Sequence, residues 1–192
     1  MMDPQEQLTL LGYDRRWLTY SFLDLALLDA QHVACLTSDD RHPEHYRFAS
    51  FGQFLRERSA VSDAELDRYV ELAVLDPDKV MAGSALAELL AWPGLGPVQF
   101  ERLASHTAFE LPFLQHLVVR RRLLAAISAG PIDDALLASC LASYDSAVQR
   151  AFVSVSGVAG SHLALLAQNG CNRAVRNLAS QQLRLRLNDS PN

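Results

Sequence analysis

The stretch that decides the fold covers residues 165–179 and reads Leu165-Leu166-Ala167-Gln168-Asn169-Gly170-Cys171-Asn172-Arg173-Ala174-Val175-Arg176-Asn177-Leu178-Ala179. Two apolar segments flank the polar turn Asn169-Gly170, and glycine directly after an apolar segment is typical of a helix end. A Leu-Ala pair followed by a polar turn and a second apolar segment also occurs at Leu72-Ala73, Leu103-Ala104 and Leu141-Ala142. The stretch therefore predicts helices joined in pairs by short turns.

Short turns, most of them with glycine or proline, divide the chain after residue 75 into segments of helical length. The turns are Asp76-Pro77, Trp92-Pro93-Gly94, Ala129-Gly130-Pro131, Tyr144-Asp145 and Ser156-Gly157. Because proline begins a helix more readily than it continues one, we expect helices near residues 78–91, 97–106, 109–128, 132–143, 146–156, 160–168 and 172–186. No segment sustains the alternation of a half-buried strand, so the predicted fold class is all-α.

The most hydrophobic segment, Trp17 to Leu36, has about the length of a membrane span. Its apolar side chains surround a helix on every side, which is typical of a membrane helix or of a helix at the centre of a core. It contains Asp24 and Asp29, and a central aspartate costs roughly 2.5–3.5 kcal/mol in a membrane. We therefore expect a buried core helix.

The first sixty residues are expected to form an irregular helical part of a single domain, 1–192, whose remaining residues, 61–187, form a helical-repeat part. A polar loop is predicted at Asp39–His45 and a short amphipathic helix at Phe48–Arg58. Ser62-Asp63-Ala64-Glu65 is a capping box and predicts a helix to about Leu75. The acidic start Met1–Glu6 does not indicate a signal peptide, and we expect a cytoplasmic protein.

The stretch 165–179 resembles a unit of HEAT or leucine-rich-repeat-variant proteins, in which a turn of Asn, Gly or Pro precedes a helix with Val-Arg and Leu-Ala. The resemblance covers about residues 62–187. It implies helical hairpins stacked as a short, irregular, right-handed superhelix that holds a partner on its concave face. The four Leu-Ala pairs are 31, 38 and 25 residues apart, which departs from an even tandem repeat.

Charge is distributed unevenly along the chain. The whole chain has a formal net charge of −5, the wrong sign for a protein that neutralises phosphates. Residues 1–90 contain sixteen acidic and eight basic residues (−8), whereas residues 91–192 contain six and nine (+3). Such a dipole can steer a charged partner or bring the two halves together.

The arginine cluster Arg120-Arg121-Arg122 is the feature that points most directly to a binding site. At 100° per residue, Arg121 falls on the apolar stripe of the predicted helix 109–128 and Arg120 falls at its edge. An unpaired buried guanidinium costs several kcal/mol, so each needs a partner. The partner is either an anion or acidic protein in a groove, or an internal carboxylate such as Asp24 or Asp29. Buried charges are usually paired within the fold, which favours the internal ion pair.

Six residues are the candidate contacts for a partner: Arg120, Arg121, His116, Trp92, Arg173 and Arg176. Trp92 lies in the stiff turn 92–97, where an exposed aromatic ring would suit an interface. The alternative, that Trp92 covers the core under this turn, is favoured because large apolar side chains are usually buried.

Three weaker patterns could carry chemistry. A zinc-like set with two-residue spacings comprises His32, Cys35, His42 and His45. A nucleophile could combine Cys171 with His162, but no third catalytic member is recognisable. The glycine-containing segment Ser156–His162 lacks the lysine and preceding strand of a phosphate loop. We expect no metal, no cofactor and no catalytic residue.

These observations predict a non-enzymatic module that binds another protein, as an adaptor, a chaperone or an inhibitor. Small acidic bacterial proteins that neutralise toxins have a similar size and charge, and the analogy rests on these two properties alone. The partner is expected to present an acidic surface, and a homodimer is a further option. Two alternatives stay open: a nucleic-acid binder that uses the arginines of the second half, and a metal-dependent enzyme built on the histidine and cysteine set.

Overall fold

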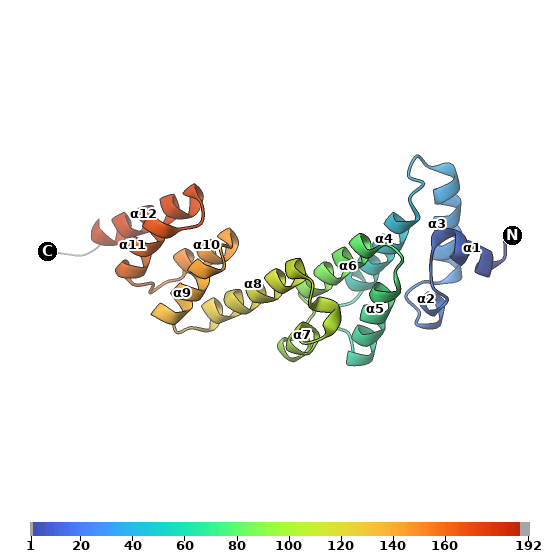
Figure 1. Cartoon of the computed structure of the whole chain (residues 1–192), viewed down its shortest axis with the longest axis horizontal. Coiled ribbons are helices and arrows are strands. Elements are labelled where there is room, and N and C mark those ends of the chain that lie inside the picture. The colour runs from blue at the N-terminus through green and yellow to red at the C-terminus, as the bar shows by residue number, and fades with distance from the viewer. Residues whose placement is uncertain (1, 189–192) are drawn as a thin grey trace. The chain divides into compact units, whose positions relative to one another are not determined.

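The structure, a computed structural model, describes residues 2–188, with side chains up to residue 186 (Figure 1). This part of the chain contains twelve α-helices, one 3₁₀ turn and no strand, which confirms the all-α class. The helices are α1 Pro4–Leu11, α2 Arg16–Thr19, α3 Leu25–Thr37, α4 Pro43–Arg56, α5 Asp63–Leu75, α6 Lys79–Ala91, α7 Pro97–Ala104, α8 Pro112–Ala129, α9 Asp134–Ala142, α10 Ser146–Ser154, α11 Gly160–Asn169 and α12 Arg173–Asn188.

The chain divides into two compact units, which we call unit 1 (Met1–Gln115) and unit 2 (His116–Asn192). The division therefore falls inside α8, whereas the sequence suggested a change of organisation near residue 60. Residue 60 lies inside unit 1, where α4 before it and α6 after it pack together. A HEAT-like stacking of the helices stays a prediction.

The predicted helix 17–36 is broken, which corrects the expectation of one continuous core helix. It consists of α2 and α3, joined by a turn in which Ser21 has a left-handed φ of 59°. Asp24 caps the start of α3, since its carboxylate accepts a hydrogen bond of 2.7 Å from the Leu27 amide. A capping aspartate is more stable at a helix start than within an apolar helix, which explains the break.

Aromatic rings form the centre of unit 1. Trp17 packs against Phe51 with ring centroids 4.5 Å apart, and Phe51 in turn lies 4.8 Å from Tyr69. Phe22 stacks on Phe54 at 3.8 Å. The predicted amphipathic helix 48–58 is part of α4 and buries Phe51, Phe54 and Leu55. It begins earlier than predicted, at Pro43, because proline suits the first turn of a helix.

A buried ion pair joins α4 to the turn between α5 and α6. The Arg47 guanidinium donates to both carboxylate oxygens of Asp76, at 2.9 and 3.1 Å, and donates a third hydrogen bond to the Leu11 carbonyl. Their side chains are 4% and 1% exposed. Asp76 also accepts from the Asp78 amide at 2.8 Å. The guanidinium and the carboxylate of this pair therefore both have hydrogen-bond partners, as buried charged groups require.

Unit 2 has its own apolar core, to which helices α8 to α12 all contribute. Phe152 of α10 is completely buried there, together with Leu163 and Leu166 of α11 and Val175 of α12. Figure 1 shows α11 and α12 side by side, in agreement with their many contacts. Each of the four Leu-Ala pairs lies in the final turns of a helix, namely α5, α7, α9 and α11.

The capping box predicted at Ser62 is confirmed. The Ser62 hydroxyl accepts a hydrogen bond from the Glu65 amide, and the Glu65 carboxylate accepts one from the Ser62 amide.

Among the described residues, no helix combines the length and the hydropathy that crossing a bilayer requires.

Candidate functional site

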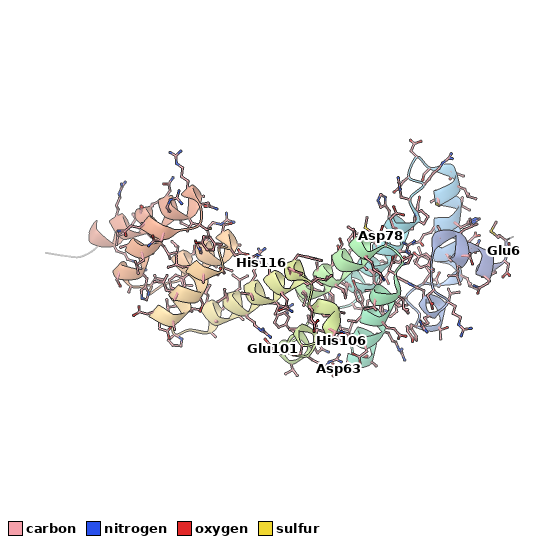
Figure 2. All side chains as sticks on the ribbon, viewed as in Figure 1. Glu6, Asp63, Asp78, Glu101, His106 and His116 are labelled. Atoms are coloured by element: carbon pink, nitrogen blue, oxygen red, sulfur yellow. The ribbon has the colours of Figure 1, made fainter. Side chains whose placement is uncertain are left out.

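The best-defined cluster of candidate residues surrounds Asp145 in unit 2, and we call it the Asp145 corner (His116, Arg120, Tyr144 and Asp145). Asp145 caps α10, since one carboxylate oxygen accepts hydrogen bonds from the Ala147 and Val148 amides at 2.8 and 3.1 Å. The other oxygen lies 3.1 Å from Nε2 of His116 and 3.7 Å from Nε of Arg120. Figure 2 labels His116 on α8.

Electrostatics keep the Asp145 carboxylate ionised although its side chain is only 7% exposed. Burial acts to raise the pKa of Asp145, but the two backbone amides, the Arg120 charge and the His116 hydrogen bond outweigh burial and lower this pKa below its usual value. The carboxylate thus anchors the histidine and the arginine. Both remain about half exposed, so the outer parts of their side chains are accessible.

Tyr144 immediately precedes Asp145 and combines two uncommon properties. Its φ is 51°, a left-handed conformation that bulky residues rarely adopt, and its side chain is 78% exposed. Backbone strain of this kind costs roughly 1–3 kcal/mol and is concentrated at functional sites. Most of the Tyr144 surface is therefore open to solvent, although its backbone conformation is unfavourable.

At two other helix ends, glycine occupies the position with left-handed backbone geometry. After α1 the left-handed position is Gly12, with φ 69°, and after α8 it is Gly130, with φ 62°. Glycine adopts this conformation without steric cost and is the usual residue just after a helix. After α9 the left-handed residue comes one position later, since Ser143 is the C-cap, and this residue is Tyr144. A tyrosine in this conformation therefore points to a role of the side chain itself.

Within the arginine cluster, Arg120 has a different partner from the two aspartates named above. Arg120 is paired within the fold, as the favoured interpretation requires, but its partner is Asp145. Asp24 caps α3, and the Asp29 carboxylate accepts a hydrogen bond of 2.9 Å from the side-chain amide of Gln7. For Arg120 the two named aspartates were wrong, because both were assigned to the centre of a core helix, whereas both are exposed. Arg121 is half-buried, and burial lowers the pKa of its guanidinium.

Three other predicted contact residues differ in accessibility. Trp92 is 8% exposed and belongs to the core of unit 1, so we remove it from the candidate surface. Arg176 of α12 donates a hydrogen bond of 2.7 Å to the Gly170 carbonyl, where it closes the end of α11. Arg173, at the start of α12, is exposed.

Of the zinc-like set, the structure brings His42 and His45 together, with ring centroids 5.1 Å apart, but it does not gather the four residues into one group. His32 is buried in α3, His42 lies 3.2 Å from Glu44, and His45 lies 2.9 Å from Asp40. Within residues 2–188, no three His, Cys, Asp or Glu side chains are grouped so that they could hold a metal ion. His162, the proposed partner of Cys171, instead contacts Asp134 at 2.7 Å.

The pair of His45 and Asp40 predicts a titration that can be measured. The hydrogen bond with Asp40 raises the pKa of His45 above its ordinary value of 6.5. The stabilisation from this contact is therefore complete below about pH 6.5 and is lost as the pH rises through the folded-state pKa. An NMR titration should give a His45 midpoint above 6.5, and Asp40→Asn should return the midpoint to about 6.5. A wild-type midpoint at or below 6.5 would contradict the contact.

Sequence reasoning missed Tyr144, which it treated as part of a turn. One signal was available: the turn Tyr144-Asp145 between two predicted helices has no glycine or asparagine, unlike Asn169-Gly170.

Comparisons of this chain with protein-family models, with curated proteins and with solved structures find no match.

Proposed function

We propose that the chain is a non-enzymatic module that binds another protein, as an adaptor, a chaperone or an inhibitor. The observation that carries the proposal is the Tyr144 ring, which is exposed on a strained residue beside Asp145. Tyrosine and arginine are the residue types that contribute most to protein interfaces. Arg120 and His116, held by the carboxylate of the next residue, Asp145, supply hydrogen-bond donors to the same corner.

Preorganisation explains why the corner is suited to binding. A side chain that is already fixed loses little entropy when a partner arrives, so more of its contact energy appears as affinity. Arg120 and His116 are fixed by a buried carboxylate, and Tyr144 has only two side-chain torsions to restrict. The corner can therefore serve as the centre of an interface without rearranging the helices.

A pair of Tyr144 variants tests the proposal. Tyr144→Gly removes the ring and the backbone strain together, so the melting temperature should stay the same or rise. Affinity capture from the source cell should recover a partner with the wild type and lose it with Tyr144→Gly. Tyr144→Phe keeps the ring and should retain most of the capture.

Two results would overturn the proposal. Equal capture of the same proteins by the wild type and Tyr144→Gly would show that the ring contributes nothing to binding. A fall of several degrees in the melting temperature of Tyr144→Gly would show that the ring stabilises the fold, so that its exposure needs no partner to explain it.

A further inference from the structure

The placement of carboxylates in unit 2 carries an inference about the chemistry of the partner. Unit 1 contains eighteen acidic and nine basic residues, a net charge of −9, whereas unit 2 contains four and eight, a net charge of +4. In the described part of unit 2, the three carboxylates are Asp133, Asp134 and Asp145. All three lie at the start of α9 or α10.

All three carboxylates also have partners within unit 2. Asp133 accepts from the Leu136 amide, Asp134 contacts His162, and Asp145 holds His116 and Arg120. Carboxylates at helix starts are stabilised by the helix dipole, so their positions serve the fold. Beyond these helix starts, the charged side chains that α8 to α12 present are all arginines.

Helix α12 carries half of the eight arginines of unit 2. Its sequence contains four arginines and no acidic residue. Val175 and Ala179 face the core, and at 100° per residue the opposite side carries Arg173, Asn177, Gln181 and Arg184, which we call the α12 face. All four side chains are exposed, and none of them has a hydrogen bond or ion pair with a side chain of residues 2–186.

The other two arginines of α12 differ from this pair. Arg176 donates to the Gly170 carbonyl, and Arg186 donates to the Val158 carbonyl. Both therefore help to hold α12 on its own unit. Arg173 and Arg184 make no such hydrogen bond to a backbone carbonyl of the described chain. They lie at the two ends of a polar face about 16 Å long.

We propose that the α12 face binds an acidic segment of the partner protein. The two arginines bind carboxylates through charge-assisted hydrogen bonds, and arginine suits the geometry of a carboxylate. Asn177 and Gln181 lie between them, and their amides can donate to and accept from a peptide backbone. The inference rests on the proposed protein-binding function and adds the charge of the partner.

An acidic protein segment fits this face better than a nucleic acid does. The whole chain has a net charge of −5, which is unfavourable for binding a long polyanion. The Phe, Tyr and Trp residues of unit 2 are Tyr144 and Phe152, and Phe152 is completely buried. A single exposed ring, Tyr144, offers little for base stacking, on which the binding of single-stranded nucleic acids depends.

The test uses the full chain and three labelled probes: a decaglutamate peptide, a single-stranded DNA of ten nucleotides and a decaglycine peptide. Fluorescence anisotropy should show binding of decaglutamate that weakens as salt is raised from 50 to 500 mM, and no binding of decaglycine. Arg173→Gln/Arg184→Gln should weaken decaglutamate binding about fivefold. The control Arg15→Gln/Arg41→Gln makes the same charge change at exposed arginines of unit 1 and should leave binding within twofold.

Each other outcome overturns the inference. Equal weakening by both double variants would show that net charge and not the α12 face attracts the probe. Tighter binding of the DNA than of decaglutamate, lost in the α12 variant, would assign the face to nucleic acid. If decaglutamate does not bind while Tyr144→Gly abolishes capture of a protein, the proposed function stands and the acidic partner is wrong.

Discussion

Asp76→Ala is expected to lower the free energy of unfolding of unit 1 by about 3–5 kcal/mol, because it leaves the buried Arg47 charge without its carboxylate. Arg47 would keep one acceptor, the Leu11 carbonyl, in a site closed to water. The turn between α5 and α6 would also lose the acceptor of the Asp78 amide. Both effects act in the same direction.

Tryptophan fluorescence during urea unfolding measures this prediction selectively. Both tryptophans of the chain, Trp17 and Trp92, are buried in unit 1, so the signal reports on that unit. Asp39→Ala, the same change at an exposed position, should alter the free energy of unfolding by less than about 0.5 kcal/mol. A loss below about 1 kcal/mol for Asp76→Ala would contradict a buried, mutually dependent ion pair.

Phe152→Ala is expected to destabilise unit 2 by a similar amount, about 3–5 kcal/mol. Phe152 is completely buried where helices from both ends of the unit meet, so its removal leaves a cavity that small neighbours such as Val175 and Ala179 cannot fill. The cost combines the lost transfer of the ring out of water with the cavity itself.

Amide hydrogen exchange of peptides from α10, α11 and α12 measures this second prediction. Protection in all three helices should fall together in Phe152→Ala, because they share one core. Leu185→Ala, at a half-exposed position of α12, is the control and should leave protection almost unchanged. Protection that falls only within α10 would show that the helices of unit 2 do not form one cooperative core.

Most of the helices could be predicted from the sequence because their ends are encoded locally. The capping box at Ser62, the prolines at Pro43 and Pro97 and the turn at Gly170 each satisfy or remove backbone groups of nearby residues, which a reader of the sequence can count. The predicted all-α class followed from such signals. The break between α2 and α3 was missed because hydrophobicity was weighed above the capping preference of Asp24.

The partners of charged residues could not be predicted because they depend on distant parts of the chain. Arg120 meets Asp145, which follows it by twenty-five residues, and Arg47 meets Asp76 across twenty-nine. Many carboxylates were available to each arginine, and sequence spacing gives no preference among them. The candidate site was therefore found in part: Arg120 and His116 were named, whereas Tyr144 emerged only from its backbone conformation and exposure.

Photo-crosslinking from position 144 tests the central claim, that the Asp145 corner contacts another protein, most directly. A photoreactive phenylalanine analogue such as benzoylphenylalanine replaces Tyr144 in one variant and Val98, which is 85% exposed in unit 1, in a control variant. The account predicts that irradiation in the source cell joins the chain to one protein from position 144 and that Arg120→Ala reduces this product, while position 98 gives no such product. Identical products from both positions, or a product with nucleic acid alone, would contradict it.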